Sequence, residues 1–202
     1  MAVFAKAPVP GEVKTRLVPL LGAQAAAELH ADLVRAALGT ASRAGLGPVL
    51  LWCAPDPGHP FFADCAASFG VELREQRGGH LGERMARAFE AMLPGGPALL
   101  IGSDCPALTE ADLRTAATSL ATHDCVLQPA EDGGYVLVGL SRPVAGLFEG
   151  IRWGGADVMR ETRGRLRATG ATWRELPRRW DVDRPEDYQR LAMSGLLSEG
   201  AR

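Results

Sequence analysis

The sequence predicts an α/β protein in which helices cover both faces of a mostly parallel sheet. Short apolar runs alternate with longer amphipathic stretches along the 202 residues, as in chains built from β-α units. Hydrophobic residues make up 47% of the chain and charged residues 23%, which is typical of a globular domain with a sizeable core. The length, together with the lack of repeats and low-complexity tracts, predicts a single domain over residues 1–202.

The first half of the chain is expected to contain three strands and three helices. Apolar runs predict strands at "AVFA" (2–5), "PVLLWC" (48–53) and "VELREQ" (71–76). Helical spacing of apolar residues predicts helices over 22–44, 60–70 and 81–93. The first of these helices should end near Gly45, because glycine readily adopts the left-handed conformation that follows a helix.

The second half continues the same alternation. The run "ALLIGSDCP" (98–106) reads as a buried strand that ends in polar residues, and further apolar runs are "CVLQPA", "GGYVLVGL" and "TWREL". Helices are expected over 109–120, 156–168 and 185–195. Thr109 with Asp112 resembles a capping box, and Pro185 followed by two acidic residues suits the first turn of a helix.

Charge and composition exclude several classes of protein. A formal net charge of −2 gives no electrostatic footprint for nucleic acid or an anionic membrane. No stretch approaches the roughly 20 apolar residues that a membrane helix needs, and the amino terminus does not resemble a signal peptide. The four cysteines and four histidines show no zinc-like spacing and predict reduced thiols, so we expect a cytoplasmic protein, monomeric or homodimeric.

The chain contains only two lysines among its 22 basic residues, and both lie in the stretch "AKAPVPGEVKTRL" (5–17). A chain that otherwise uses arginine and yet has lysine at Lys6 and Lys14 suggests that a compact ammonium group is needed there. With Gly11 and Arg16, these residues suit the phosphates of a nucleotide. The alternative is a surface loop that is basic by chance; the P-loop pattern is not matched.

Two acidic stretches are candidates for a magnesium site. Asp104 ends an otherwise apolar strand, and the segment "DVD" (181–183) precedes the last helix. Mg²⁺ (or Mn²⁺) commonly takes one or two protein carboxylates and fills its other positions with phosphate and water. The alternative interpretation is that these aspartates only cap helices and turns. Trp153 and Trp180 are interpreted as core anchors.

Five motifs together resemble those of the DUF2064 family: "FAKAPVPGEVKTRL", "LGERM", "GSDCPALT", "PAEDGGYVLVGL" and "WDVDRPEDYQRL". The resemblance extends from about Val3 to Leu191. This family is one group of the GT-A-fold superfamily, is often labelled glycosyltransferase and is associated with arsenosugar biosynthesis. The wider superfamily includes nucleotidyltransferases such as molybdenum cofactor guanylyltransferase. The resemblance therefore implies a GT-A (nucleotide-diphospho-sugar transferase) fold with three α/β/α layers.

The resemblance also implies roles for individual residues. Lys14 and Arg16 correspond to basic residues that bind a triphosphate, and Asp104 and Asp183 to metal ligands; these four form the expected catalytic set. Nucleotide binding is expected at Lys6, Gly11, Lys14, Arg16, Leu81, Gly82 and Arg84, and acceptor binding at Asp132, Gly133, Gly134 and Tyr135. The chain departs from the family pattern where Gly154 and Gly155 replace Ser-Thr and where Val136 replaces an aromatic residue.

Three functions fit these residues. The first is Mg²⁺-dependent nucleotidyl transfer from an NTP to a phosphorylated or anionic small molecule, with release of pyrophosphate; the basic loop favours it, and an ionised acceptor needs no general base. The second is transfer of a sugar from an NDP-sugar, with Asp132 as the candidate base. The third is a nucleotide-binding module without catalysis.

Overall fold

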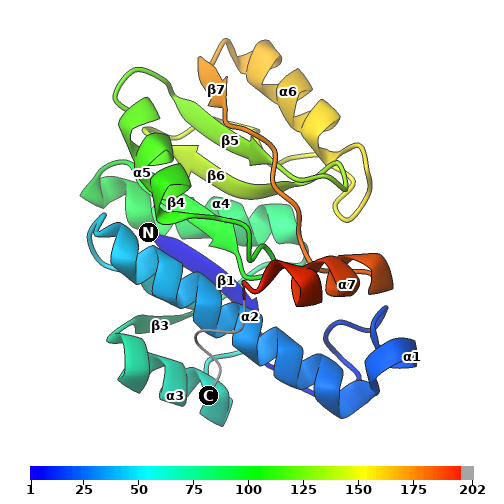
Figure 1. Ribbon diagram of the computed structural model, residues 1–202. Coiled ribbons are helices and arrows are strands. Elements are labelled where there is room, and N and C mark those ends of the chain that lie inside the picture. Colours follow the sequence, from blue (N-terminus) through cyan, green and yellow to red (C-terminus); the bar gives the residue numbers. More distant parts are fainter. Residues whose placement is uncertain (197–202) are drawn as a thin grey trace.

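Within residues 1–196, which the computed structural model describes, seven strands form one sheet in the order β3-β2-β1-β4-β6-β5-β7 (Figure 1). The last six residues of the domain predicted over 1–202 lie outside the described residues. The strands are β1 (Ala2–Lys6), β2 (Leu50–Ala54), β3 (Glu72–Glu75), β4 (Ala98–Gly102), β5 (Cys125–Pro129), β6 (Tyr135–Leu140) and β7 (Trp173–Glu175).

The sheet is mostly parallel, as predicted, and β6 is the exception. It pairs antiparallel with both β4 and β5, whereas all other neighbouring strands are parallel. The short connection over 130–134 explains this direction, because a parallel pair needs a crossover of a dozen or more residues. As a result, the carboxyl end of β5 and the start of β6 lie at the same edge of the sheet as the carboxyl ends of β1 and β4.

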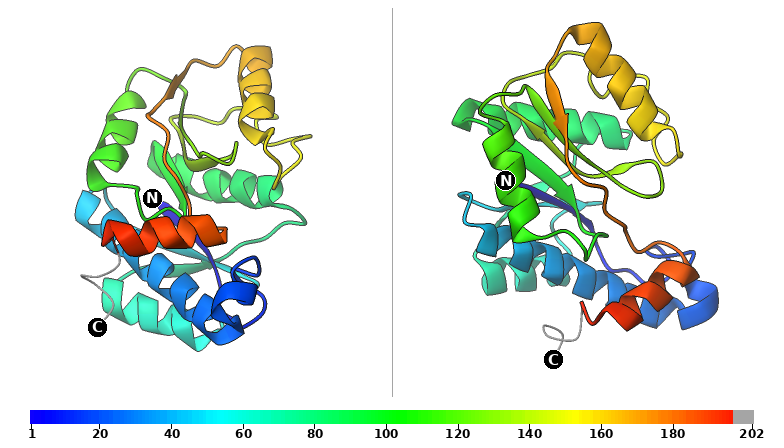
Figure 2. Two further views of the ribbon diagram at one scale, coloured as in Figure 1. Left: turned by 45° about the vertical axis from the view of Figure 1, so that its right-hand side comes forward. Right: turned by 45° about the horizontal axis from the view of Figure 1, so that its top comes forward.

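Helices cover both faces of the sheet, which gives the predicted three layers (Figures 1 and 2). One face carries α2 (Ala23–Ala44), α3 (Pro60–Phe69) and α5 (Glu110–Ser119), and the other carries α4 (Leu81–Met92) and α6 (Val158–Thr169). A short helix α1 (Val18–Leu21), a 3-10 turn η1 (Leu93–Gly95) and α7 (Pro185–Ser194) complete the described chain. None of the helices within residues 1–196 combines the length and the apolar character needed to cross a membrane.

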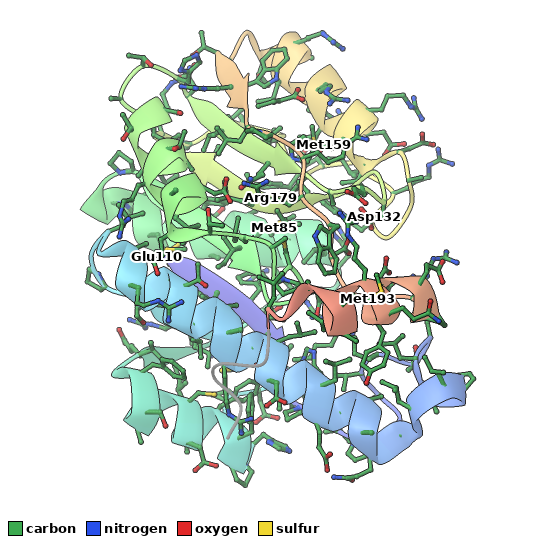
Figure 3. All side chains as sticks on the ribbon, in the orientation of Figure 1. Met85, Glu110, Asp132, Met159, Arg179 and Met193 are labelled. Atoms are coloured by element: carbon green, nitrogen blue, oxygen red, sulfur yellow. The ribbon has the colours of Figure 1, made fainter. Side chains whose placement is uncertain are left out.

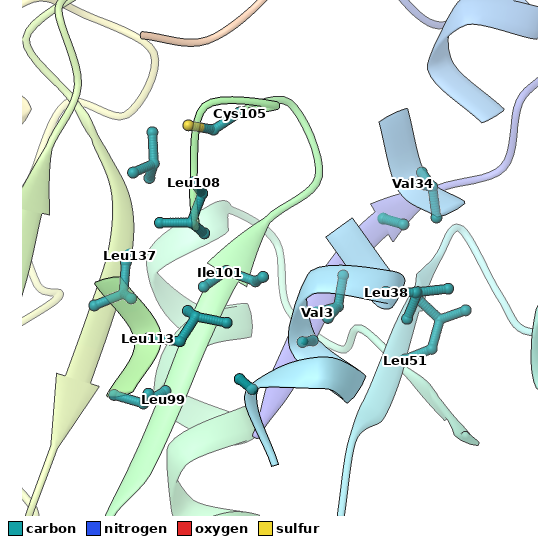
Figure 4. Packing of buried hydrophobic residues seen from close by; sticks show 14 of the residues in the cluster. Val3, Val34, Leu38, Leu51, Leu99, Ile101, Cys105, Leu108, Leu113 and Leu137 are labelled. Carbon is teal, nitrogen blue, oxygen red and sulfur yellow. The ribbon is translucent and has the colours of Figure 1, made fainter. Parts of the chain in front are cut away.

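Alternate strand residues supply two separate cores, one on each face of the sheet. Val3, Leu51, Leu99, Ile101 and Leu137 point to the first face, where they pack against side chains of α2 and α5 (Figure 4). The intervening residues, such as Phe4 and Leu100, pack against α4 and α6. This division follows from the two-residue repeat of a strand, which sends successive side chains to opposite faces.

A third, smaller core lies beyond the carboxyl end of β1. Leu17, Leu33, Trp180, Val182 and Leu191 pack together there, which attaches α7 and the segment before it to α2. Trp180 is therefore a core anchor, as predicted. This cluster positions the segment 181–183 beside the loop that follows β4.

The predicted elements agree with the structure within a few residues at most boundaries. Thr109 and Asp112 form the expected capping box, and Gly45 ends α2 in the left-handed conformation with φ 69°. The short helix α1 was not predicted. The strand β6 begins at Tyr135 rather than at Gly133, because Gly133 lies in the preceding turn with φ 95°.

Two glycine-to-alanine substitutions test the packing of the sheet. A Cβ atom at Gly139 in β6 would lie 2.5 Å from Leu99 Cδ2 and 2.6 Å from Val126 Cγ1, so Gly139→Ala should lower the free energy of unfolding by about 1–3 kcal/mol. At Gly164, exposed within α6, a Cβ meets nothing within 4 Å. Gly164→Ala should raise stability by about 0.5–1 kcal/mol through helix propensity. Urea unfolding measures both, and equal effects would contradict this packing.

Candidate active site

Four loops gather at the edge of the sheet where β1, β4 and β5 end: residues 7–17, 103–109, 130–134 and 176–184. In open α/β sheets this edge is where ligands bind. The backbone of Val182 donates a hydrogen bond to the carbonyl oxygen of Asp104 at 2.8 Å, so the last of these loops runs directly beside the loop after β4. The polar residues that the sequence singled out are thereby brought to one place.

Lys14 joins three of these segments. Its ammonium donates to Asp104 Oδ1 at 2.5 Å and to the carbonyl oxygen of Val182 at 2.6 Å. The Lys14 side chain is only 4% exposed, whereas that of Asp104 is 50% exposed. Lys14 also has φ 48°, a left-handed conformation that is costly for a residue with a side chain. The buried ammonium therefore acts as the internal counter-ion of Asp104, and the loop backbone is strained to place it there.

His30 of α2 is a further member of this junction. Its Nε2 lies 3.0 Å from the carbonyl oxygen of Lys6, and its Nδ1 lies 3.8 Å from Asp104 Oδ1 without a hydrogen-bond partner among the described residues. Burial by itself raises the pKa of Asp104, but the Lys14 ammonium and the His30 imidazole together hold that pKa well below its usual value. Asp104 is therefore ionised at neutral pH.

Sequence reasoning missed His30, although a signal was present. The buried face of α2 consists of alanine, leucine, valine and glycine apart from this one residue. A single polar side chain on an otherwise apolar helix face indicates a buried partner, because a buried polar group is costly when it is left unpaired.

Arg16 and Asp183 form a second ion pair, on the outside of the junction. Their side chains are 57% and 41% exposed, so water solvates both partners. The backbone N–H groups of Asp183 and Arg184 donate to the Asp187 carboxylate, which fixes the segment at the start of α7. The Asp183 carboxylate is thus paired with the Arg16 guanidinium. Asp181 and Asp183 flank Val182 in the chain.

A cavity of about 200 Å³ opens beside Asp104 at this edge. It is lined by Leu81, Gly102, Asp104, Cys105, Ala130, Asp132, Gly134, Tyr135, Val136, Trp153, Gly154, Gly155, Val158 and Asp181. Asp132 lies between the connection to α6 and helix α7 (Figure 3). Three carboxylates therefore reach one cavity from three different loops.

Asp181 differs from Asp104 in its electrostatic surroundings. Burial raises its pKa to about 6, and the nearby carboxylates of Asp132, Asp104 and Asp183 act in the same direction. The sequence identified the 181–183 segment, and the family resemblance favoured Asp183 as its metal-binding residue. The structure places Asp181, rather than Asp183, in the cavity lining.

The other residues predicted to bind the nucleotide differ in their exposure and in what they contact. Lys6 is exposed at the end of β1, and Gly11 lies in an exposed turn with φ 84°. Leu81 is 43% exposed and lines the cavity at the start of α4. A Cβ atom at Gly82 would lie 2.6 Å from both Trp153 Nε1 and the carbonyl oxygen of Phe148, so Gly82 is required for packing beneath the cavity wall. Arg84 donates to the carbonyl oxygen of Gly78 and steadies that loop.

Some of the residues predicted to bind the acceptor line the cavity, and one of them serves packing instead. Asp132, Gly134 and Tyr135 line the cavity, but Gly133 does not. A Cβ atom at Gly133 would lie 2.1 Å from the carbonyl oxygen of Ala156, so this glycine permits a close approach of two backbone segments. Trp153, interpreted from the sequence as a core anchor, is half-buried and forms one wall of the cavity.

The carboxylates fit a divalent cation only in part. Across residues 1–196, no three His, Cys, Asp or Glu side chains converge to hold a metal by themselves. Asp104 and one aspartate of the 181–183 segment supply two hard oxygen ligands, and Mg²⁺ commonly completes its shell with phosphate and water. Burial and, to a smaller extent, the neighbouring carboxylates raise the pKa of Asp181, and a cation bound among these carboxylates would offset their mutual repulsion. The residues therefore suit a cation that arrives with a phosphate ligand.

The chain matches a family described as "Uncharacterized protein conserved in bacteria (DUF2064)" over residues 33–155, more than half of its length. The chain belongs to the DUF2064 family. A comparison with curated proteins gave no match.

Solved structures similar to this DUF2064 chain share its fold. A protein from Desulfovibrio desulfuricans G20, provisionally assigned as a nucleotide-diphospho-sugar transferase, has a TM-score of 0.87 and 32% identity over 100% of this chain and 89% of that one. The inositol-1-phosphate CTP transferase from T. maritima has a TM-score of 0.62 at 13% identity, covering 98% and 96%. Rv0371c from Mycobacterium tuberculosis H37Rv in complex with manganese has 0.57 at 21%, covering 96% and 97%. The predicted fold is confirmed.

Removal of the buried Lys14 ammonium should destabilise this DUF2064 protein. Lys14→Met leaves Asp104 without its counter-ion, and because Asp104 is half exposed we expect a loss of about 2–3 kcal/mol in the free energy of unfolding. The control, Arg16→Met, removes an exposed partner of Asp183 and should cost less than about 1 kcal/mol. Denaturant unfolding at neutral pH compares them, and equal losses would contradict the role of Lys14.

The charge of Asp181 should make stability depend on pH. A folded-state pKa of about 6 means that the folded protein binds a proton more tightly than the unfolded chain, so this residue destabilises the fold once the pH exceeds both pKa values. Asp181→Asn should therefore be more stable than wild type by about 1–2 kcal/mol at pH 7.5, with the difference vanishing near pH 4.

The matched control for this pH dependence is Asp183→Asn. Because Asp183 is exposed and already paired with Arg16, its removal should change stability by less than about 1 kcal/mol, without a gain at pH 7.5. Unfolding curves at pH 4, 5.5 and 7.5 provide the measurement. A stability difference for Asp181→Asn that is constant across this range would show that a raised pKa of Asp181 is not its cause.

Proposed function

We propose that this protein is a divalent-cation-dependent transferase that moves a sugar from an NDP-sugar to a small-molecule acceptor. The observation that carries this proposal is that Lys14 and Arg16 are already paired with Asp104 and Asp183. Few cationic side chains at the cavity are therefore available for a donor. The diphosphate of an NDP-sugar carries fewer negative charges than a triphosphate, so one divalent cation leaves less charge for cationic side chains to neutralise.

The residues at the edge of the sheet divide between donor and acceptor. Asp104 would hold the cation together with a carboxylate of the 181–183 segment, either Asp181 on the cavity side or Asp183 on the Arg16 side. A bound Mg²⁺ or Mn²⁺ supplies positive charge that stabilises the departing nucleoside diphosphate. Exposed Lys6 suits the distal phosphate, and exposed Leu81 offers an apolar surface to the nucleoside.

Asp132 is the candidate base for the acceptor. It lines the cavity, and its Oδ1 accepts a hydrogen bond from the Gly134 amide at 2.8 Å, which holds the carboxylate in place. Transfer to a hydroxyl group requires a group that takes the hydroxyl proton, and a positioned carboxylate suits that role.

Nucleotidyl transfer from an NTP to an anionic acceptor is the second candidate. The observation that favours it is the cationic loop itself, in which Lys6 is exposed and Arg16 is 57% exposed. Release of Arg16 from Asp183 would make its guanidinium available to a triphosphate. The third possibility, a nucleotide-binding module, would bind a donor in the same place without turning it over.

A donor panel distinguishes the three. Four NTPs and several NDP-sugars are tested with Mg²⁺ or Mn²⁺ by thermal shift and by analysis of the nucleotide released. We expect cation-dependent stabilisation by an NDP-sugar and release of NDP. Pyrophosphate release from an NTP would replace the first candidate by the second, and binding without turnover of any donor would support the binding module.

Variants locate the cation within this assay. Asp104→Asn should abolish the cation-dependent part of the thermal shift. The variant should fold with a lower Tm than wild type, because Lys14 loses its counter-ion but keeps two neutral acceptors, the amide oxygen of the substituted side chain and the Val182 carbonyl oxygen, so each shift is measured against the variant's own cation-free Tm. The matched control is Glu12→Gln, which removes an exposed carboxylate from the loop after β1. Asp181→Asn and Asp183→Asn are then compared, and the variant that binds Mn²⁺ more weakly identifies the second ligand. Unchanged Mn²⁺ binding by Asp104→Asn would contradict the assigned site.

A further inference from the structure

Carboxylates are the only charged side chains in the lining of this cavity, which lies within the described residues. Asp104, Asp132 and Asp181 line it, and no lysine, arginine or histidine of the described chain belongs to the lining. Asp104 is neutralised from beneath by Lys14, but Lys14 itself does not line the cavity. Asp132 and Asp181 therefore set its charge. A phosphate or carboxylate group that enters this cavity without a cation to neutralise it would face like charges, which oppose its binding.

The remaining walls are aromatic or small. Tyr135 and Trp153 meet edge to face with ring centroids 6.3 Å apart at 90°. The Tyr135 hydroxyl points into the core, where it contacts Met85 Sδ at 3.8 Å, so it is the ring of Tyr135 that is available to the cavity. A Cβ atom at Gly154 would meet nothing within 4 Å, which leaves the wall open there. Flat apolar walls with a few polar groups suit a small ring compound.

The polar atoms at the cavity mostly accept hydrogen bonds. The Gly134 amide occupies Asp132 Oδ1, whereas Asp132 Oδ2 has no hydrogen-bond partner among the described residues. Asp181 adds a second carboxylate. A ligand that satisfies such groups must donate hydrogen bonds, as hydroxyl groups do.

We propose that this cavity binds the acceptor and that the acceptor is an uncharged ring compound bearing several hydroxyl groups. Its hydroxyls donate to Asp132, and also to Asp181 if Asp183 is the second ligand of the cation, and its ring packs against Trp153 and Tyr135. A cationic compound is less suitable, since it would compete for carboxylates with the divalent cation beside Asp104. This assignment rests on the proposed function for the donor, and it differs from the anionic acceptor that the sequence favoured.

In the proposed transfer, every bond formed is matched by a bond broken, and the proton has an acceptor. The acceptor hydroxyl oxygen forms a bond to the anomeric carbon of the sugar, and the bond from that carbon to the β-phosphate oxygen breaks. The electron pair of the broken bond leaves with the nucleoside diphosphate. The hydroxyl proton passes to Asp132, which later releases it to solvent.

Paired acceptors test the class of compound. The donor is the NDP-sugar that gives the largest thermal shift, and the rate of NDP release is measured with each acceptor. Two neutral compounds are compared with phosphorylated counterparts: methyl glucoside with glucose 6-phosphate, and myo-inositol with inositol 1-phosphate. Glucosamine provides the cationic case. We expect at least one neutral compound to accelerate NDP release, with kcat/KM at least 10-fold above its phosphorylated counterpart. Preference for the phosphorylated member or for glucosamine, or no acceleration by any neutral compound, would overturn the proposal.

A charge reversal inside the cavity provides the sharper test. Asp132→Lys should reverse the selectivity in acceptor binding, measured by ligand-observed NMR, so that glucose 6-phosphate binds more tightly than methyl glucoside. The matched control is Glu131→Lys, which makes the same change of charge one residue away; Glu131 is exposed, pairs with Arg190 and does not line the cavity. The control should keep the preference for neutral compounds, and reversal in both variants would overturn the proposed site.

The acceptor proposal and the donor proposal fail in different ways. Donor binding is read by thermal shift without any acceptor, so its loss would indicate failure of the proposed function itself. An NDP-sugar that binds with the cation while anionic acceptors react best would leave the donor function intact and overturn only the acceptor class.

Discussion

The ion pair between Lys14 and Asp104 is the constraint on which the arrangement of the site depends. An ammonium group that is 4% exposed must find matching acceptors, because an unpaired buried charge is strongly unfavourable. Lys14 finds them in Asp104 and in the backbone of Val182, and so holds together the loop after β1, the end of β4 and the segment before α7. A lysine suits this place because its compact ammonium reaches both acceptors at once.

The division of charge across the site follows from that pair. Lys14 and His30 stabilise the ionised form of Asp104 from the protein side, whereas the carboxylates of Asp132 and Asp181 face the cavity with no cationic residue in its lining. The cationic side chains lie on the loop after β1, outside the cavity. One edge of the sheet therefore carries exposed cationic side chains beside a cavity whose charged lining residues are carboxylates, and the proposed separation of donor and acceptor rests on this division.

The direction of β6 makes this separation possible. Because β6 runs antiparallel to both neighbours, the turn over 130–134 lies at the same edge as the ends of β1 and β4. The close approach of Gly133 to Ala156 then brings the connection that carries Trp153 against this turn. The positions of Asp132 and of the aromatic wall thus depend on one hairpin, whereas Asp104 and Asp181 reach the cavity from other loops.

The sequence by itself determined the elements other than α1 and η1, the capping box of α5, the first turn of α7, the mostly parallel sheet and the two acidic stretches, because periodicity and capping act over a few residues. Only the tertiary structure decided that Lys14 is buried against Asp104, that His30 joins them, that Asp181 rather than Asp183 lines the cavity, and that Gly82 and Gly133 serve packing. The partners of Lys14 lie 90 and 168 residues away along the chain, and no local pattern specifies such pairs. Packing of the sheet and its helices selects them.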